Sequence, residues 1–192
     1  MIKEIKELKK QLDNNFSVQK RNDDGRVIVD LTITNDDQFL SPYSTDKHSV
    51  ISSDVAEFIE NSLEMVPVND RINFHIHSDV IDEKEKKEYK EAISTYYTER
   101  YKVTRAENRR LKGIALIMAL VAVFTLTVMI WLELSGLKNA VFLEVVDIFA
   151  WVFMWEAVDI FFLRCSALRI KEKRYLSLID SKIDFLPIKI KS

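Results

Sequence analysis

The feature that most constrains this chain is an apolar stretch at residues 113–132, which reads GIALIMALVAVFTLTVMIWL. None of its 20 residues is charged. A helix of about 20 apolar residues crosses a bilayer core of about 30 Å, whereas the buried helices of soluble proteins are seldom apolar over that length. Because lipid cannot satisfy free backbone groups, such a span has to be helical. The stretch therefore predicts a transmembrane helix.

A second candidate span, residues 141–163, follows after the short loop ELSGLKNA. Basic residues gather on the outer flanks of the two spans, and the loop between them contributes only Lys138. The flanking residues are Arg105, Arg109, Arg110 and Lys112 before the first span, and Arg164, Arg169, Lys171, Lys173 and Arg174 after the second. Because positive charge is retained on the cytoplasmic side, this bias predicts a multi-pass protein of the cell membrane with both termini cytoplasmic.

Composition and motifs argue against several other classes of protein. The net charge of the 192 residues is −2, which is unlike the basic excess of a nucleic-acid-binding protein. The single cysteine, Cys165, excludes an internal disulfide. There is no Gly-rich phosphate loop or nucleophile–base motif, and MIKEIKELKKQL at the start lacks the apolar core of a signal peptide. We therefore expect neither an enzyme nor a bound cofactor.

Residues 1–79 predict a small cytoplasmic α+β module that begins with a short amphipathic helix over residues 1–12. Asp24-Gly25 is a turn signal and predicts a hairpin within residues 16–35. A helix is expected from Ser52, or one of the two residues after it, to about Met65. RINFHIHS at 71–78 alternates as a strand, with Ile72 and Phe74 on the side opposite His75.

The rest of the chain predicts helices. Residues 80–112 form a long connecting helix that enters the first span without a Pro or Gly break, and residues 164–192 form a basic cytoplasmic segment that is helical over 166–186. The expected fold is an α+β membrane protein: a β-β-α-β-α module that includes the connecting helix, a transmembrane hairpin over 113–163, and a C-terminal amphipathic helix.

The second span carries a repeated acidic motif, because EVVDIF at 144–149 returns as EAVDIF at 156–161. Its acids are Glu144, Asp147, Glu156 and Asp159. The fourteen Val, Leu, Ile and Phe residues of the span contribute about 6 kcal/mol of insertion free energy, whereas four central carboxylates cost about 12 kcal/mol. The span therefore requires shelter, protonation or bound cations.

Helical geometry spreads the acids over about half the circumference, in two levels about 18 Å apart. The first span offers only the hydroxyls of Thr125 and Thr127 to shelter them, so we expect the acidic face to meet other copies of the helix, water, or both. Trp151 and Trp155 lie between the two levels, where their N–H groups would donate to a neighbouring copy. The sequence thus predicts a homo-oligomer.

Facing copies bring acid against acid, which leaves three alternatives. The carboxyls are protonated, they bind cations as carboxylate rings do in channels, or flanking bases reach inward, with Lys112 and Arg164 toward Asp159 and Lys138 toward Glu144. The first two predict an oligomeric membrane protein that binds or conducts cations or protons. The third predicts a non-conducting adaptor or sensor, in which the acids specify helix pairing and the cytoplasmic module binds a partner.

Two further groups of residues are candidate sites. His75 and His77 project from one strand face together with Asp79 and would hold a metal ion if a third ligand such as His48 joined them; the alternative is a histidine pair packed on the sheet. The basic residues Arg164, Arg169, Lys171, Lys173 and Arg174 would contact anionic lipid headgroups, or serve orientation alone. Cys165 at the membrane interface is either a small packing residue or a palmitoylation site.

HIHSDVIDEKEKKEYKEAI together with EVVDIFAWVFMWEAVDIFFLR resembles a family of small two-span bacterial membrane proteins that has no assigned activity. The resemblance covers residues 40–185 and implies the same two-span topology. The architecture is also loosely similar to that of mitochondrial-type calcium uniporters, in which an Asp-x-x-Glu box lies between a Trp and a Pro. Here the order is Glu-x-x-Asp and no Pro follows, so this similarity implies no calcium selectivity.

Overall fold

The computed structural model describes residues 21–45, 49–64, 66–136 and 139–188. The chain divides into two compact units. The first, here called the sheet unit, consists of Met1–Tyr101 and Lys173–Ser192, and the second, the helical unit, of Lys102–Glu172. The helix expected over residues 1–12 lies outside the described residues. The fold is α+β, with a small parallel sheet and one long apolar helix.

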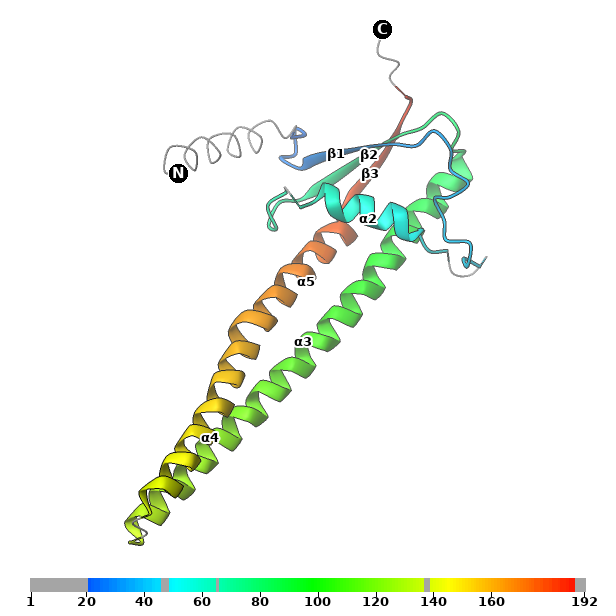
Figure 1. Ribbon diagram of the computed structural model, residues 1–192. Coiled ribbons are helices and arrows are strands. Elements are labelled where there is room, and N and C mark those ends of the chain that lie inside the picture. The colour runs from blue at the N-terminus through cyan, green and yellow to red at the C-terminus, as the bar shows by residue number, and fades with distance from the viewer. Residues whose placement is uncertain (1–20, 46–48, 65, 137–138, 189–192) are drawn as a thin grey trace, which may run out of the picture. The chain divides into compact units, whose positions relative to one another are not determined.

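The sheet unit contains three parallel strands, β1 (Val27–Thr32), β2 (Ile72–His77) and β3 (Lys182–Leu186), in the order β1-β2-β3 (Figure 1). The register places Asp30 of β1 and Asp184 of β3 on either side of His75 in the central strand. Period-two alternation directs Val29, Phe74 and Ile183 to one face and these three polar residues to the other. Only the first face carries a helical layer among the described residues.

The C-terminal helix predicted over 166–186 is wrong beyond Ile179, where the helix ends, because β3 begins three residues later. Lys182-Ile183-Asp184-Phe185 alternates with period two, a strand signal that the preceding helical pattern obscures. This segment forms a strand because it pairs with the free edge of β2, which lies more than 100 residues away in sequence. Tertiary pairing here overrides the local helical preference.

The N-terminal hairpin is seen only in part. Val27–Thr32 forms the expected strand, and Gly25 has a φ of 72°, which a turn glycine adopts without strain. Within the described residues an isolated antiparallel bridge joins Arg21 to Val27, and the earlier part of the expected hairpin lies outside them. The partner that builds a ladder with β1 is β2, in a parallel arrangement.

The helix α2 (Ser53–Ser62) confirms the element expected near residues 52–65. The Ser52 side chain caps it by accepting from the Val55 N–H. Its Ala56 and Ile59 pack in one buried cluster with the apolar sheet face and with Tyr97 of α3. This cluster of large side chains is the core of the sheet unit.

The helix α3 (Glu83–Leu134) is 52 residues long and supplies residues to both units. Asp82 caps its start by accepting from the backbone N–H groups of Lys84 and Glu85, while the Glu85 carboxylate accepts from the Asp82 N–H. The helix continues without interruption through residues 113–132, as expected from the absence of an internal break. Of the described residues, this is the one helix long and apolar enough to cross a membrane.

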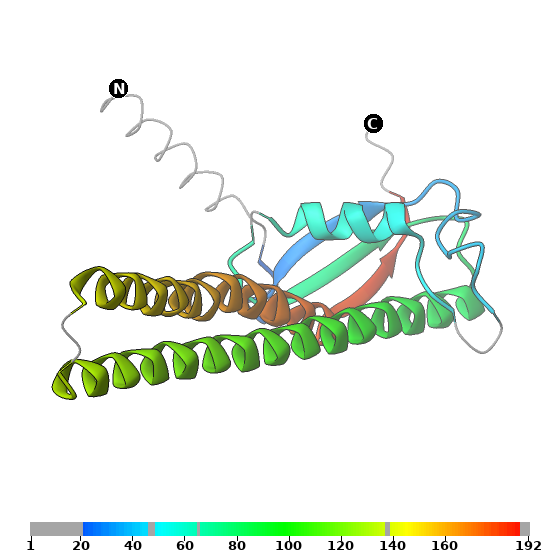
Figure 2. The same ribbon diagram turned by 60° about the horizontal axis from the view of Figure 1, so that its bottom comes forward.

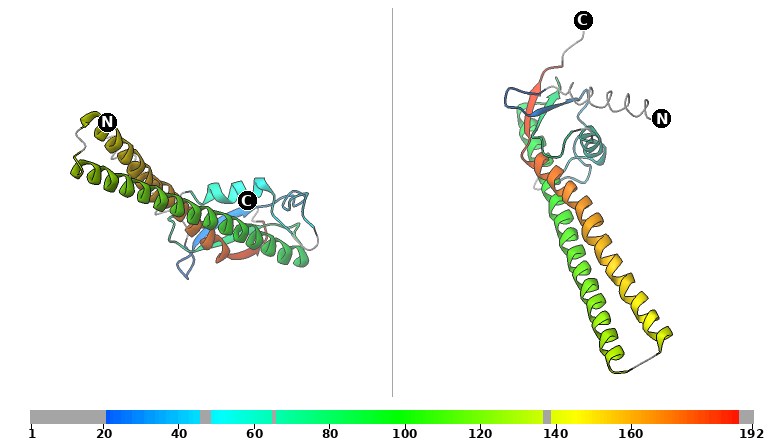
Figure 3. Two further views of the ribbon diagram at one scale, coloured as in Figure 1. Left: turned by 90° about the horizontal axis from the view of Figure 1, so that it is seen from below. Right: turned by 90° about the vertical axis from the view of Figure 1, so that its left-hand side faces the viewer.

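The helical unit consists of the second half of α3, then α4 (Ala140–Asp159), a π-helical turn η1 (Ile160–Arg164) and the first half of α5 (Cys165–Ile179). In this unit α4 returns alongside α3 in every view (Figures 2 and 3). Its buried side chains include alanines that recur every seven residues, at Ala115 and Ala122 of α3 and at Ala150 and Ala157 of α4. Small residues at this spacing allow two helix backbones to approach closely.

Candidate functional site on the acidic face of α4

The four acids of the repeat all lie on α4. Glu144 is exposed, and Asp147, Glu156 and Asp159 are half-buried. Eight residues lie between Asp147 and Glu156, so the acids form an outer level near the start of α4 and an inner level near its end. The two levels have different surroundings.

At the inner level, Arg164 forms ion pairs with both acids. Its Nε donates to Asp159 Oδ2 at 2.9 Å, and its Nη2 donates to Glu156 Oε1 at 3.0 Å. One guanidinium therefore holds both carboxylates, and charge-assisted hydrogen bonds of this kind are about twice as strong as neutral ones. The inward-reaching base of the third alternative is found here, and it binds Glu156 as well as Asp159.

The π-helical turn makes this arrangement possible. Arg164 follows Asp159 by five residues, and in a regular α-helix it would lie about 140° around the axis from it. In η1 the backbone bonds run from i to i+5, as in the bond from the Cys165 N–H to the Ile160 carbonyl, and residue i+5 comes back above residue i. The extra residue in this turn therefore brings the base over the acids, a feature that helical periodicity did not predict.

The outer level has no basic partner in the described part of the chain. The structure gives no hydrogen bond or ion pair for Glu144 or Asp147, and Lys138, the base expected near Glu144, lies outside the described residues. Trp151 and Trp155, between the levels, are 54% and 66% exposed. The indole groups therefore point away from the interior of the helical unit.

Thr125 and Thr127 do not contact the acids. Each hydroxyl donates to the carbonyl four residues earlier in α3, Val121 and Val123 respectively, at 2.8 Å. This local bond satisfies a hydroxyl donor in apolar surroundings. Lys112, the other base expected near Asp159, lines the mouth of an apolar groove of about 430 Å³ between α3 and α4, together with Ala115, Ala157 and Phe161.

The histidines lie on the second sheet face, here called the polar face, which carries Asp30, Asn73, His75, His77 and Asp184. His77 Nε2 is 3.1 Å from Asp30 Oδ1, and its Nδ1 is 3.3 Å from the Pro187 carbonyl oxygen. His75 lies between two carboxylates, with ring nitrogens 3.7 Å from Asp30 and 3.8 Å from Asp184. The sequence did not single out either aspartate, because only the parallel register brings them beside the histidines.

The polar face does not form a metal centre among the described residues, where no group of three or more His, Cys, Asp or Glu has the geometry to hold an ion. Asp79, which was grouped with the two histidines, accepts from the Ile188 N–H, and His48, the suggested further ligand, lies outside the described residues. Asn73 is fully buried, and its Nδ2 donates to Asp184 Oδ2 at 3.1 Å. The face is thus a hydrogen-bonded network of acids, histidines and an amide.

The basic residues after the second span have different environments. Arg164 holds the inner acids, whereas Arg169 and Lys171 are exposed. Lys173 Nζ donates to Asn69 Oδ1 at 3.4 Å, and Arg174 Nη2 donates to the Glu64 carbonyl at 3.5 Å within the sheet unit. Arg169 and Lys171 are therefore the members of this set that remain available to an anionic surface.

No protein-family model, curated protein or solved structure matches the chain.

Proposed function

We propose that the chain is a two-span membrane protein that self-associates through the acidic face of α4 and binds cations at the outer acidic level. The observation that carries this proposal is the asymmetry between the two levels. Glu156 and Asp159 share one base, Arg164, whereas Glu144 and Asp147 have no base in the described part of the chain. Uncompensated carboxylates in apolar surroundings require a counter-charge or a proton.

The exposed apolar side chains of the helical unit support the proposal that this unit lies in a membrane. Large apolar side chains point outward over both helices, among them Leu116, Phe124, Val152, Trp155 and Phe162. An outward apolar surface of this extent is stable in lipid or against other apolar helices, and not in water. The proposed orientation keeps both termini in the cytoplasm, with Arg169 and Lys171 at the inner headgroups.

Self-association gives the outer acids a chemical role. Copies of α4 around a shared axis would place Glu144 and Asp147 in rings of carboxylate oxygens, which are the ligands that hard cations prefer. Trp151 and Trp155, exposed in the single chain, would then donate their N–H groups to carboxylates of a neighbouring copy. Cation binding at this level, with conduction where the ring is open, is the expected activity.

The test compares the two levels in purified full-length protein reconstituted in liposomes. We expect Glu144→Gln with Asp147→Asn to abolish cation binding, measured by calorimetry with Ca²⁺, Mg²⁺ and K⁺, and to abolish cation flux. The matched control, Glu156→Gln with Asp159→Asn, should retain binding. Binding that survives the outer pair of substitutions, or that is missing from the wild type, would overturn the assignment.

The Arg164 contacts favour a second candidate, a non-conducting adaptor whose intramembrane acids specify helix pairing while the sheet unit binds a partner. In that case the oligomer persists and neither cations nor protons cross the membrane. Crosslinked oligomers together with zero flux would select this alternative over the first.

A further inference from the structure

We propose that the outer edge of β3 pairs with β3 of a second copy, antiparallel and centred on Ile183, so that two three-stranded sheets join into one. This contact lies in the sheet unit and does not rest on the self-association proposed for α4. The argument uses the free backbone groups of β3, the charge order along the strand, and the groove beside it.

The edge of β3 offers unpaired backbone groups. The Ser78 N–H donates to the Leu186 carbonyl, which fixes the even-numbered residues of β3 as those that bond to β2. In a parallel pair the bonding residues alternate, so the N–H and C=O groups of Ile183 and Phe185 point to the outer edge. No strand among the described residues pairs with this edge.

The charges on β3 are self-complementary in one antiparallel register. When Ile183 faces Ile183 of the second copy, Lys182 lies directly opposite Asp184 of that copy, and Asp184 opposite its Lys182. These are non-hydrogen-bonded positions, at which Cα atoms are about 4.5 Å apart and side chains are closest. A shift of this register by one pairing step sets Asp184 against Asp184, a repulsive arrangement, so the charges select the first register.

The existing partners of the two side chains do not prevent this pairing. Lys182 Nζ donates to Asp24 Oδ2 at 2.8 Å, a hydrogen bond that together with the lysine charge holds the pKa of Asp24 below its usual value. An ammonium carries three donors and a carboxylate two acceptor oxygens, so both groups have capacity for a further partner. Charged residues on an edge strand more often prevent pairing between sheets. Here the order Lys-Ile-Asp favours pairing instead, because it sets each lysine opposite an aspartate of the second copy.

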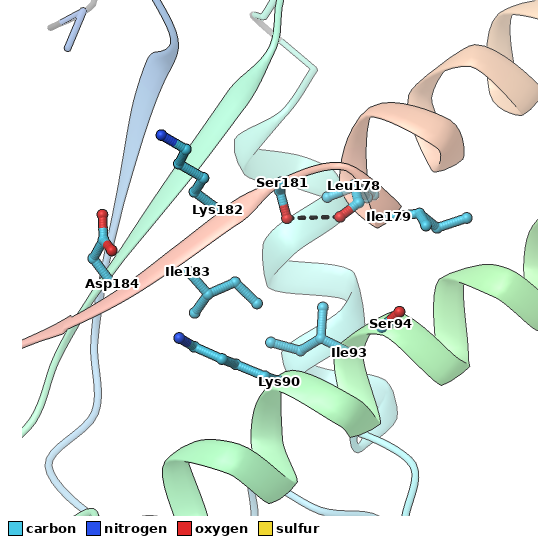
Figure 4. Close-up of a pocket in the computed structure, with 9 residues that line it drawn as sticks. All are labelled: Lys90, Ile93, Ser94, Leu178, Ile179, Ser181, Lys182, Ile183 and Asp184. Atoms are coloured by element: carbon cyan, nitrogen blue, oxygen red, sulfur yellow. Dashed lines mark hydrogen bonds between the residues drawn. The ribbon is translucent and has the colours of Figure 1, made fainter. Parts of the chain in front are cut away.

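A groove of about 360 Å³ lies between β3 and α3, on the face of the strand that carries Ile183 (Figure 4). Ile183 points into it toward Lys90 and Ile93 of α3, whereas Lys182 and Asp184 point to the other side of the strand. In the proposed register Phe185 of the second copy lies opposite Ser181, at the wall of the groove formed by Leu178 and Ile179. The pairing would thus bring an aromatic side chain of the second copy beside the groove.

The paired segment has defined limits. The Ser181 N–H already donates to the Leu178 carbonyl, so only its carbonyl is free to accept from Phe185 of the second copy. At the other end Pro187 has no N–H and cannot extend the ladder. The interface therefore comprises Ser181–Phe185 from each copy, about Ile183 as its centre.

The test is disulfide trapping of the full chain in membranes, in a Cys165→Ala background. Ile183→Cys places two thiols on the symmetry axis, where Cα atoms of a hydrogen-bonded pair are about 5.5 Å apart, within disulfide range. We expect a covalent dimer as the main product of mild oxidation. Thr32→Cys on the opposite edge of the sheet is the control and should remain monomeric.

Charge reversal tests the register. Lys182→Asp or Asp184→Lys alone sets like charges opposite each other at two symmetric positions, and each should lower the yield of trapped dimer about fivefold. The double reversal restores complementarity and should recover the yield, while Asp24→Asn, which removes only the internal partner of Lys182, should leave it unchanged. Thermal unfolding of each variant confirms that it is folded.

The remaining outcomes decide against the proposal. A folded Ile183→Cys variant that stays monomeric means that the charged edge prevents pairing. Equal trapping at Thr32→Cys means random collision, and single reversals without effect exclude the register. Because Glu144 and Asp147 are intact in all of these variants, cation binding is measured in the same samples and separates this result from the proposal for α4.

Discussion

The two units of this protein have opposite interiors. In the sheet unit the buried residues are large, with Phe74, Ile76 and Tyr97 at most 1% exposed, and the outward side chains are mostly polar. In the helical unit the seam, here meaning Ala115, Ala122, Ala150 and Ala157, consists of buried alanines, and most of the large apolar residues are exposed. A core of large side chains derives its stability from burial away from water. Buried alanines gain little from such burial, because each removes only a small apolar area from water.

The carboxylates of the two units also differ in their surroundings. Carboxylates of the sheet unit such as Asp30 and Asp184 lie at a water-accessible face, whereas the helical unit places four carboxylates on an otherwise apolar helix. Only two of these four have a base in the described part of the chain. The acids of the two units therefore differ in their surroundings as well as in their partners.

The largest effect is expected from truncating matched aromatics. Phe74→Ala empties the centre of the sheet unit and should lower its free energy of unfolding by about 3–5 kcal/mol. Phe162→Ala, at a side chain that is 64% exposed, should cost much less in detergent because it leaves no internal cavity. Chemical denaturation of the two variants in the same detergent measures both, and equal losses would contradict the contrast between the units.

The next effect concerns the inner acids. Arg164→Gln leaves Glu156 and Asp159 without a counter-charge, and one carboxylate at the centre of a span costs about 2.5–3.5 kcal/mol of insertion free energy, less near its end. We expect a lower inserted fraction in a translocon insertion assay, restored when Glu156→Gln and Asp159→Asn are added. Arg169→Gln is the control without an acidic partner in the structure, and an Arg164→Gln variant that inserts like the wild type would refute the arrangement.

A smaller effect is expected at the seam. Ala157→Leu adds three carbon atoms where Ala157 is 5% exposed, and overpacking of this kind costs about 1–3 kcal/mol. The larger side chain should separate α4 from α3 and lower the thermal stability of the helical unit. Val152→Leu, on the outward surface, provides the comparison. If both substitutions have the same effect on melting temperature, the seam is not closely packed.

The smallest effect is a pH dependence of the sheet unit. Burial raises the pKa of Tyr97, so the folded state keeps its phenol neutral at pH values where the unfolded chain ionises. The stabilising contribution is complete below pH of about 10 and is lost as the pH rises above it. We expect Tyr97→Phe to flatten the loss of stability above pH 10 in denaturation curves. Tyr43→Phe, at a 90% exposed side chain, should leave the curve unchanged.

The sequence predicted much of this architecture from local patterns. The cap at Ser52, the alternation of β2 and the uninterrupted helix into residues 113–132 each follow from a few neighbouring residues. The acidic face of α4 was also predictable, because helical periodicity alone distributes four acids around an axis. Membrane insertion, orientation and the resemblance to two-span bacterial proteins remain predictions.

Other features had no local signal strong enough to predict them. β3 was assigned to a helix because its five residues directly follow a helical pattern, and only the free edge of β2 makes the strand favourable. The π-helical turn changes which residues share a face by adding one residue to a turn, so periodicity missed the contact between Arg164 and Glu156.

The amino-acid sequence by itself determined where this protein is apolar, where it is helical and where its acids lie, because these properties depend on side-chain chemistry and short-range spacing. The tertiary structure alone decided that one base binds both inner acids and which strand has a free edge. Such contacts join residues that are distant in sequence or displaced by one irregular turn, and their free energy exists only once the chain has folded.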